Sequence, residues 1–446
     1  MKKVLIITYY WPPSGGSGVQ RWLKFAKYLP QYGWEPVVYT PENPEANSID
    51  EALLKDVGPQ TTVIKRKIVE PYGFYKALSG KKGSQIKANL VSSSNNKKSF
   101  VQRLSLFIRG NLFIPDPRIL WVSPSVRFLK KYLKENPVDA IVSTGPPHSM
   151  HLIAKKLSKS TGIPWLADFR DPWTGIFYFK HLGLSKFAYR RHRKLEQSVH
   201  NNADRIVVVS EKMRRDFEKC TKTPVVTITN GFDTDDFKPS GKDEEILPGN
   251  GEKKFILAHT GLMVDDGNPD TLWRVLGERA SVDPDFRNNL EIRVMGQTDA
   301  SIIEDIKANG LADNFTDMGY VAHNTATYWQ QNASLLLLPL RKEPEATAIL
   351  TGKFFEYLAA GRPILAFGPT EGDLAKALAQ TKSGIICDWD QEDAIKKAID
   401  TAYEDYLAHD NTKPANRELS EAALKYSRRE LAGSLSVLLN EMINKK

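Results

Sequence analysis

Short apolar segments alternate with longer amphipathic ones along most of the chain, which is the pattern of an α/β protein. The apolar segments are continuous runs, as expected for strands buried on both faces of a parallel sheet. In the first half they span residues 4–8, 35–39, 62–65, 140–143, 165–168, 205–209 and 225–229. A second series spans residues 255–259, 291–295, 315–318, 334–339, 364–367 and 384–387. The pattern therefore predicts two doubly wound domains.

A polar stretch rich in Gly, Pro and charged residues, 238–252, separates the two series and predicts a linker. Near the carboxyl end, apolar residues recur at helical spacing, so we expect a closing amphipathic helix. They are Leu431, Leu435, Leu438 and Met442. We expect an amino-terminal domain over residues 1–240, a second domain over 250–424, and a terminal helix over 425–446. Two such domains imply a cleft between them, which is a common place for a ligand.

The composition is that of an ordinary soluble globular protein, since 41% of the 446 residues are hydrophobic and 26% are charged. No apolar run approaches the roughly 18 residues of a membrane span. The amino terminus begins like a signal peptide, but its short apolar run leads into a Gly-rich loop, so we expect a first strand there. The two cysteines, Cys220 and Cys387, lack metal-ligand spacing. These features predict a cytoplasmic location.

The net charge of +9 is concentrated in the first half of the chain. Between Pro71 and Pro115 there is no acidic residue, and aromatic residues are interspersed with cations. The cations are Lys76, Lys81, Lys82, Lys87, Lys97, Lys98, Arg103 and Arg109. A second acid-free run lies between Asp171 and Glu196. Such a patch fits an anionic membrane surface, a solvated loop, or nucleic acid, and we take the membrane surface forward.

A Gly-rich loop with Gly15, Gly16 and Gly18 follows the first predicted strand and opens a helix. Glycines let the backbone approach a ligand closely, and the amino end of a helix attracts phosphate. The loop is similar to a dinucleotide-binding fingerprint but lacks its third glycine, and Thr40 stands where an acid would hold a ribose. The loop alone is compatible with a dehydrogenase cofactor site, another phosphate or sugar site, or a structural turn.

One segment of the second half predicts a short helix between two buried strands. Thr351 can begin the helix, Gly361 can adopt the left-handed conformation just past its end, and Pro363 prevents its continuation. Lys353 and Glu356 would then lie at the amino end of a helix on the carboxyl side of a parallel sheet, where α/β folds bind ligands. A carboxylate there also suits the helix dipole, so Glu356 could equally be a capping acid.

Two segments resemble motifs of the family 4 glycosyltransferases. Asn230-Gly231-Phe232-Asp233 resembles that family's asparagine-glycine-hydrophobic-aspartate turn, and residues 356–363 resemble its donor-binding helix and the strand that follows. The order and separation of these motifs, the Gly-rich loop and the terminal helix also fit. The resemblance implies a GT-B fold, in which two Rossmann-like domains face a central cleft and the terminal helix packs back on the first domain.

The resemblance implies a nucleotide-sugar site in the second domain. Glu356 would hold the ribose hydroxyls, since a carboxylate can accept hydrogen bonds from two vicinal hydroxyls. Other residues would contact the diphosphate, the sugar or the base. They are Ile349, Leu350, Thr351, Gly352, Lys353, Thr260, Gly261, Gly296, Gln297, Tyr320 and Val321. In the first domain Gly15, Gly16 and Gly18 would lie beside the leaving group and the acceptor.

The sequence departs from the family pattern in two places. Family members commonly carry a second acid eight residues before the ribose glutamate, and here that position is Ala348. An Arg and a Lys often follow the turn after the domain's first strand, where this chain has the acidic segment 262–268. Charge for a diphosphate must then come from elsewhere. Lys353 is our first candidate, ahead of Arg341 and Lys342, although it could be a solvated surface lysine.

Two loops of the first domain follow neighbouring predicted strands on the acceptor side. His148 or Asp168 could orient an acceptor hydroxyl, and Arg170 could bind a phosphate or form a structural pair with Asp171. No pair of carboxylates stands out as the acid and nucleophile of a glycosidase. The resemblance instead implies retaining transfer, in which the donor's own phosphate oxygen helps to take the acceptor proton. We predict no metal and no cofactor beyond the donor itself.

The sequence therefore predicts a cytoplasmic, membrane-peripheral, retaining glycosyltransferase that builds a cell-envelope polysaccharide or a lipid-linked glycan. Its expected partners are a nucleotide-sugar, a glycan or lipid-linked acceptor and an anionic membrane surface, but not nucleic acid. Two alternatives remain open. One is a nucleotide-sugar epimerase of the same architecture. The other is a non-catalytic nucleotide- or sugar-binding protein, which Ala348 and the missing basic pair would favour.

Overall fold

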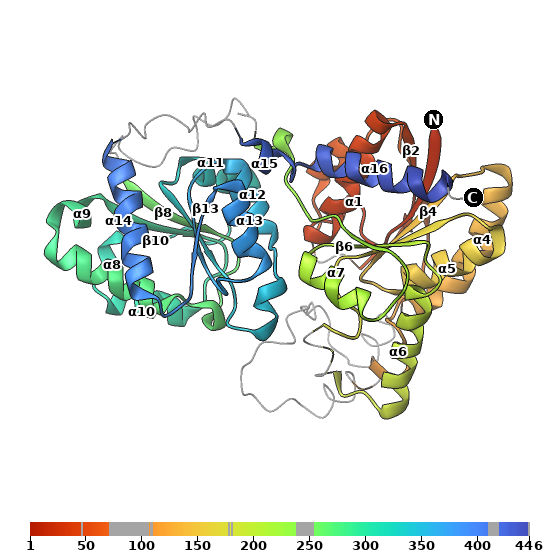
Figure 1. The fold of residues 1–446 in the computed structure, drawn as a ribbon, viewed down its shortest axis with the longest axis horizontal. Coiled ribbons are helices and arrows are strands. Elements are labelled where there is room, and N and C mark those ends of the chain that lie inside the picture. The colour runs from red at the N-terminus through yellow and green to blue at the C-terminus, as the bar shows by residue number, and fades with distance from the viewer. Residues whose placement is uncertain are drawn as a thin grey trace. The chain divides into compact units, whose positions relative to one another are not determined.

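The computed structural model describes residues 1–45, 48–70, 107, 110–176, 179, 182–237, 254–408 and 419–444. The chain divides into two compact units: unit 1 is Met1–Thr229 with Leu431–Lys446, and unit 2 is Asn230–Glu430. Most of the acid-free run between Pro71 and Pro115 and the predicted linker lie outside the described residues. Figure 1 shows that each unit is a central sheet with helices on both faces.

Unit 1 contains a seven-stranded sheet in the order β3-β2-β1-β4-β5-β6-β7, and every pair of neighbours is parallel. The strands are β1 Lys2–Ile7, β2 Trp34–Pro41, β3 Thr62–Arg66, β4 Ala140–Gly145, β5 Trp165–Phe169, β6 Arg205–Val208 and β7 Val225–Thr227. The helices are α1 Ser17–Tyr28, α4 Ile119–Glu135, α5 Ser149–Thr161, α6 Lys186–His200 and α7 Glu211–Glu218. The strand order reverses between β1 and β4, so the loops that follow these two strands open at the switch point of the sheet.

Unit 2 contains a six-stranded parallel sheet in the order β10-β9-β8-β11-β12-β13. The strands are β8 Phe255–Thr260, β9 Leu290–Met295, β10 Phe315–Asp317, β11 Leu335–Pro339, β12 Ile364–Phe367 and β13 Gly384–Cys387. The helices are α8 Asp270–Val282, α9 Pro284–Asn289, α10 Ala300–Ala308, α11 His323–Asn332, α12 Gly352–Ala360, α13 Asp373–Thr381, α14 Glu392–Ala408 and α15 Glu421–Leu424. Here the switch point lies between β8 and β11.

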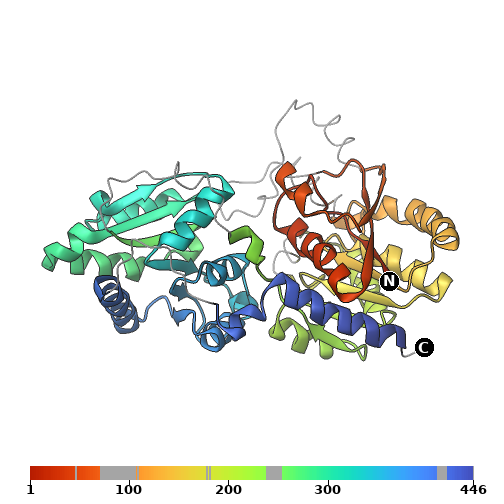
Figure 2. The same cartoon turned by 90° about the horizontal axis from the view of Figure 1, so that it is seen from above.

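The last helix, α16 Arg428–Asn444, packs on unit 1 (Figure 2). The apolar residues predicted to form its stripe are buried against α1 and the first strands. Glycine at position 433 allows this close packing, because a Cβ there would lie 3.0 Å from the ring of Tyr32. The predicted amphipathic helix is therefore present. Its apolar face completes the core of a domain whose first residue lies more than 400 positions earlier in the chain.

The two places where the chain passes between the units lie beside each other. Phe232 forms a bridge with Ser427, its amide donates to the carbonyl of Tyr426 at 3.1 Å, and its carbonyl accepts from the amide of Arg428 at 2.7 Å. Phe232 is also buried in the core of unit 2. The Asn230–Asp233 turn, where the chain enters unit 2, is therefore hydrogen-bonded to residues 426–428, where the chain leaves it.

The prediction of two doubly wound α/β domains is confirmed. Each predicted strand overlaps an observed one, because burial on both faces of a parallel sheet requires the continuous apolar runs seen in the sequence. The strands before and after α12 are almost fully buried. None of the helices in the described ranges is long and apolar enough to cross a membrane.

Candidate functional site

The loops after β8, β9 and β10 of unit 2 meet at the carboxyl edge of the sheet through glycines. The amide of Gly261 donates to Met295 O at 2.6 Å, and that of Gly296 donates to Gly319 O at 2.6 Å. A Cβ on Gly296 would lie 2.2 Å from the carbonyl oxygen of Gly261. All three glycines have positive φ, of 107°, 130° and 60° in chain order. The positive φ favours glycine at all three positions, and at Gly296 the close approach of Gly261 also excludes a Cβ, so no side chain from these positions occupies this edge of the sheet.

Helix α12 forms where the local signals predict it. Thr351 is its N-cap and accepts a hydrogen bond from the amide of Phe354 at 3.3 Å. Gly361 follows its end in the left-handed conformation, with φ 69°. Gly352 begins the helix and is exposed, while Ile349 and Leu350 are half-buried against the core just before it. The helix starts directly after the β11 loop, so its amino end lies at the switch point between β8 and β11.

Glu356 belongs to a chain of hydrogen bonds that joins α12, α11 and β8. Its Oε2 accepts from Nε2 of Gln330 at 3.2 Å, and the same nitrogen lies 2.8 Å from Oγ1 of Thr260. The hydroxyl of Tyr357 accepts from the backbone amide of Thr260 at 2.9 Å. Glu356 itself is half-buried, so one side of its carboxylate is oriented by protein while the other can reach a ligand. That arrangement suits recognition of a polyol such as ribose.

Lys353 lies over Gly261. Its Nζ donates to Leu262 O at 2.9 Å, and a Cβ on Gly261 would lie 2.4 Å from its Cε. Burial lowers the pKa of Lys353 to about 8, although Glu356 opposes the shift. The Nζ also lies 3.5 Å from Nε2 of His259, whose Nδ1 donates to Leu337 O at 2.9 Å. Lys353 therefore places a cation, protonated at neutral pH, beside the glycine turn.

His259 is the neutral neighbour of that cation. Burial and the charge of Lys353 lower the pKa of His259 to about 3. Because a carbonyl oxygen can only accept, the proton of the imidazole sits on Nδ1 and Nε2 presents a lone pair toward Lys353. His259 thus supports the lysine without adding charge.

The other two basic candidates are already paired with acidic residues in or near the loop that follows β8. Arg341 lies 3.6 Å from Asp266 and 3.9 Å from Glu343, and Lys342 lies 3.5 Å from Asp270. These contacts explain how an acidic segment is tolerated at this edge of the sheet. They also leave Lys353 as the candidate cation closest to the glycine turn.

The residues predicted to flank a base lie at the far side of the same edge. Gln297 follows β9, is exposed, and its carbonyl accepts from the amide of Met263 at 2.9 Å. Tyr320 and Val321 follow β10, and Tyr320 is 96% exposed. A large aromatic side chain without protein packing is unusual in a folded protein and is suited to stacking on a ligand. The backbone of Gly296 packs directly against that of Gly261. The side chain of Tyr320 makes no comparable packing contact among the described residues.

In unit 1 the Gly-rich loop and Arg170 come together. Gly16 precedes α1 with φ 95°, and a Cβ on Gly15 would lie 2.7 Å from Oγ of Ser48. A Cβ on Gly18 would lie 3.0 Å from a guanidinium nitrogen of Arg170, which also donates to Gly18 O at 3.2 Å. Arg170 donates to Pro146 O as well, so its charge is held by backbone oxygens of the first turn of α1 and of the loop after β4. The structure thus assembles one polar surface from the loops after β1, β4 and β5.

His148 lies at the start of α5 within a group of buried aromatic rings. Its imidazole stacks on Trp173 at 4.6 Å between ring centroids, and its Nδ1 lacks a hydrogen-bond partner among the described residues. Burial, together with the charges of His151 and Arg170, holds the pKa of His148 well below its usual value. His148 is therefore neutral at physiological pH. The absence of a side chain at Gly145 leaves room for the His148 ring, because a Cβ there would lie 2.9 Å from Nδ1 of His148.

Asp168 is fully buried at the end of β5 and has a complete set of donors. Arg21 donates to its Oδ1 at 2.9 Å, while Trp22 Nε1 and Thr144 Oγ1 donate to Oδ2 at 2.7 and 2.8 Å. Arg21 also donates to the carbonyls of Ile228 and Thr229, which end unit 1. A carboxylate with this many donors organises the fold, because little of its hydrogen-bonding capacity remains for a substrate.

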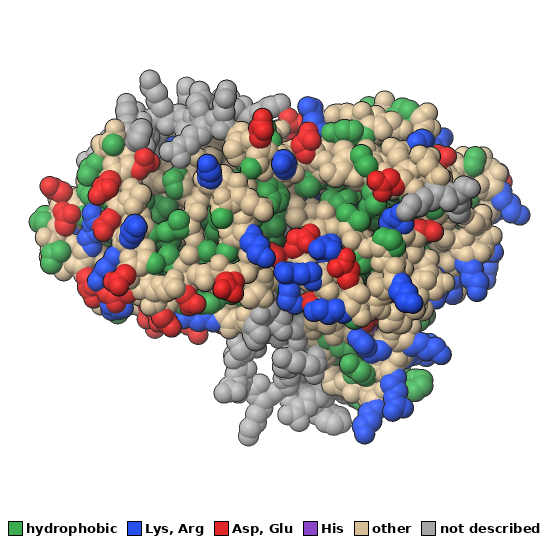
Figure 3. All heavy atoms as spheres, in the orientation of Figure 1, with side chains coloured by type: hydrophobic (Ala, Val, Ile, Leu, Met, Phe, Trp, Pro, Cys, Tyr) green, Lys and Arg blue, Asp and Glu red, His purple; other side chains and the backbone are tan. Residues whose placement is uncertain are grey.

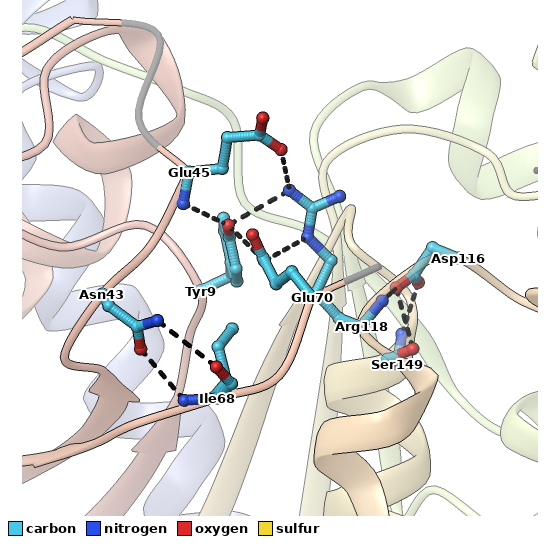
Figure 4. Close-up of polar contacts among 8 residues, drawn as sticks. All are labelled: Tyr9, Asn43, Glu45, Ile68, Glu70, Asp116, Arg118 and Ser149. Atoms are coloured by element: carbon cyan, nitrogen blue, oxygen red, sulfur yellow. Dashed lines mark hydrogen bonds and ion pairs between the residues drawn. The ribbon is translucent and has the colours of Figure 1, made fainter. Parts of the chain in front are cut away.

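A second polar network lies at the same edge of unit 1 and is drawn in Figure 4. Arg118 lies 3.1 Å from Glu70 and donates to the hydroxyl of Tyr9 at 3.1 Å, and that hydroxyl donates to Glu70 at 2.6 Å. The amide of Glu45 also donates to Tyr9 at 2.7 Å. Burial raises the pKa of Tyr9 above its usual value, so the phenol stays protonated. The network joins the loops after β1, β2 and β3 to the start of α4.

Several residues that shape these sites were not predicted from the sequence. Gln330 and His259 orient Glu356 and Lys353, and Arg21 neutralises Asp168. Tyr357 could have been noticed as the neighbour of Glu356, but its hydroxyl turns to Thr260 on another strand. Gln330 and Arg21 carry no local signal, because each looks like an ordinary polar position of an amphipathic helix. Only their contacts with distant residues reveal their roles.

Two family models match the chain. The model described as Glycosyltransferase Family 4 matches residues 86–236, and the model described as Glycosyl transferases group 1 matches residues 254–405. Together they span about two-thirds of the chain; the first falls mostly on unit 1 and the second lies within unit 2. No curated protein matches the chain in sequence.

Solved structures share the fold at low sequence identity. Sucrose-phosphate synthase from Thermosynechococcus elongatus has a TM-score of 0.59 at 14% identity over 100% of both chains. Anabaena Alr3699/HepE in complex with UDP has a TM-score of 0.55 at 13% identity, covering 100% of this chain and 99% of that one. A variant of S. aureus TarM in complex with fondaparinux, alpha-GlcNAc-glycerol and UDP has a TM-score of 0.54 at 14% identity, covering 99% and 100%. At such identities the likeness shows the fold, which is GT-B.

Proposed function

Because the chain belongs to glycosyltransferase family 4, we propose that it transfers a sugar, with retention, from a nucleotide-diphosphate sugar bound on unit 2. The observation that carries this proposal is the cluster of Glu356, Lys353 and Gly261 at the switch point of the unit 2 sheet. It combines an oriented carboxylate for ribose, a cation for phosphate and a glycine turn that leaves room for both. Solved structures of the same fold contain UDP.

Glu356 and Lys353 would have distinct roles. Glu356 would bind the nucleotide in both ground and transition states, so its main effect would be on donor affinity. Lys353 would neutralise charge that develops on the diphosphate as it leaves, so it would also lower the barrier. In the proposed retaining step the bond from the sugar C1 to the phosphate oxygen breaks, a bond from C1 to the acceptor oxygen forms on the same face, and the acceptor proton passes to the departing phosphate.

Unit 1 would bind the acceptor at the loops that hold Gly18, Arg170 and His148. Arg170 would attract a negatively charged group, and neutral His148 would orient a hydroxyl. We propose a glycan or a lipid-linked acceptor used in cell-envelope polysaccharide synthesis at the cytoplasmic membrane surface. The support is chemical: the acid-free, aromatic-containing segments of unit 1 suit an anionic lipid surface.

Calorimetric titration with UDP, GDP and their sugar conjugates tests the donor proposal. We expect one nucleotide class to bind in the micromolar range, and Glu356→Ala to weaken it by about ten- to a hundredfold, since hydrogen bonds to a charged group contribute about 1.5–3 kcal/mol. The melting temperature of the unliganded variant should stay close to that of the wild type. Unchanged affinity in Glu356→Ala would refute the ribose assignment.

Transfer itself is tested by incubating the bound donor with membrane lipid extracts and analysing products by mass spectrometry and NMR. A new glycoside with the donor's anomeric configuration supports the proposal. Donor binding with no transfer and no epimerised sugar would instead identify a nucleotide-binding protein, the reading that Ala348 favours.

A further inference from the structure

The amino-terminal part of α6 carries a surface, here called the α6 face, in which exposed cations surround exposed aromatic rings. Its members are Lys186, Phe187, Tyr189, Arg190, Arg191, Arg193 and Lys194, all of which are exposed. Phe187 is 69% exposed and Tyr189 is 48% exposed. Figure 3 shows cationic and apolar side chains gathered together over the lower end of α6. Exposed apolar side chains that gather in one patch with a rim of charged residues mark interaction surfaces, including membrane-binding ones.

The opposite side of α6 explains why these side chains point outward. Ser185 caps the helix by accepting from the amide of Ala188 at 3.2 Å. Ala188, His192 and Glu196, spaced four residues apart, are buried in unit 1. Helical geometry then sends the intervening residues away from the domain. Phe187 lies one turn before Arg190 and Arg191, so its ring has cations as its nearest helical neighbours.

A neighbouring segment extends the apolar part of the surface. The side chain of Asn111 accepts from the amide of Ser185 at 2.7 Å and donates to Gly183 O at 3.3 Å. These bonds hold residues 110–112 against the start of α6. Leu112, which follows Asn111, is 70% exposed. An aliphatic side chain and an aromatic ring are thus presented together at one end of the helix.

The charge of this surface is not balanced within the protein. The run between Asp171 and Glu196 has no acidic residue, and Glu196 itself turns inward to bind Thr174. Of the five cations on the α6 face, only Arg193 has an ion-pair partner among the described residues, at 3.9 Å from Glu196. The surface therefore combines about five positive charges with protruding apolar side chains, a combination that attracts anionic lipid headgroups and lets apolar groups enter the interface.

We propose that the α6 face binds the surface of a membrane containing anionic lipids, with Phe187 and Leu112 entering the interface and Lys186, Arg190 and Arg191 contacting headgroup phosphates. Nucleic acid fits less well, because an exposed aliphatic side chain such as Leu112 cannot stack on a base. This assignment rests on the membrane location proposed above, but not on the transfer reaction.

Flotation with vesicles tests the assignment, using phosphatidylcholine alone and phosphatidylcholine with 30% phosphatidylglycerol. We expect binding to the anionic vesicles that weakens in 0.5 M salt. The triple variant Lys186→Glu/Arg190→Glu/Arg191→Glu should bind at least about a hundredfold more weakly, since each cation near such a surface adds about fivefold. Phe187→Ser should lose roughly tenfold at unchanged net charge.

A matched control is available on α4. Lys130, Lys131 and Lys134 are also exposed in unit 1, and reversing them changes the net charge by the same amount. This control variant should keep most of the vesicle binding, and every variant should keep its affinity for the donor nucleotide. Equal losses in the α4 and α6 variants, binding to neutral vesicles alone, or tighter binding to duplex nucleic acid than to anionic vesicles would overturn the proposal. If the wild type bound no nucleotide, the donor-site proposal would be contradicted, and the proposal for the α6 face would still be decided by the vesicle measurements.

Discussion

The side-chain amide of Gln330 donates to the carboxylate of Glu356 at 3.2 Å. The two residues lie on neighbouring helices, α11 and α12, and the same amide nitrogen lies 2.8 Å from Thr260 at the end of β8. Glu356 is therefore held by the fold before any ligand arrives. Preorganisation of this kind means that a nucleotide does not have to order the carboxylate as it binds.

Gln330→Leu should weaken nucleotide binding although Gln330 need not touch the ligand. The substitution conserves approximate volume but removes the bonds to Glu356 and Thr260, so the carboxylate loses its fixed orientation. We expect affinity to fall about five- to tenfold, the effect of one hydrogen bond of about 1 kcal/mol. Calorimetry measures this change. The control is Gln331→Leu, because the neighbouring amide donates to Phe237 O instead. Equal affinities in the two variants would contradict a positioning role for Gln330.

Donor affinity should depend on pH through Lys353. Burial lowers the pKa of this lysine to about 8, so its charge is present below that pH and is lost as the pH rises through it. Above pH 8 the affinity of the wild type for a nucleoside diphosphate should fall by up to about tenfold per pH unit. Binding isotherms between pH 7 and 9.5 measure this slope.

Two substitutions isolate that effect. Lys353→Met should bind more weakly at pH 7 and show little further loss at higher pH. Lys353→Arg should retain binding at pH 9, because a guanidinium keeps its charge there. A wild-type slope that persists in Lys353→Met would assign the titration to another group.

Asp168→Asn should reduce stability strongly and donor affinity little. The substitution removes the carboxylate charge that faces the buried Arg21, and breaking a buried pair in this way costs about 3–5 kcal/mol. Urea unfolding followed by tryptophan fluorescence measures the loss. Nucleotide affinity should be unchanged because the donor residues lie on unit 2. A variant that is as stable as the wild type yet fails to transfer sugar would instead give Asp168 a role in catalysis.

The buried histidines of unit 1 should make the protein sensitive to mild acid. The pKa values of His148, His151, His192 and His200 are all lowered by burial, that of His151 to about 3 and that of His200 to about 4. The unfolded chain takes up these protons near pH 6.5, so the stability is complete above that pH and is lost as the pH falls below it. Each histidine should contribute about 1.4 kcal/mol per pH unit to the decline.

His200→Phe tests this dependence, because neither ring nitrogen of His200 has a hydrogen-bond partner among the described residues. The ring already packs against Phe169 and Phe217, so phenylalanine should keep the stability at pH 7. The decline of the free energy of unfolding with falling pH should become shallower by about 1.4 kcal/mol per pH unit, the contribution of one histidine. Substituting the exposed His323 by Gln is the control and should leave the slope unchanged. An unaltered slope in His200→Phe would mean that other groups cause the acid sensitivity.

Local features of the sequence were sufficient to predict the strands and the ends of α12. Residues 364–367 form a strand with the predicted bounds, and Thr351 and Gly361 cap the helix as their side-chain chemistry dictates. Such features depend on a few adjacent residues, so they can be read before the fold is known. The roles that the family resemblance implied for Glu356 and Lys353 remain predictions, although the structure places both beside the glycine turn.

The sequence by itself determined two parallel α/β units, their topological class and the segments that form their carboxyl edges, because burial imposes a periodic pattern on the chain. Only the tertiary structure decided which polar residues are available to a ligand. Asp168 is occupied by Arg21 and Trp22, whereas Lys353 is held by a backbone carbonyl. Hydrogen bonds and ion pairs between residues about ninety or more positions apart leave no periodic trace, so the partner of a charged side chain cannot be read until the fold brings the two together.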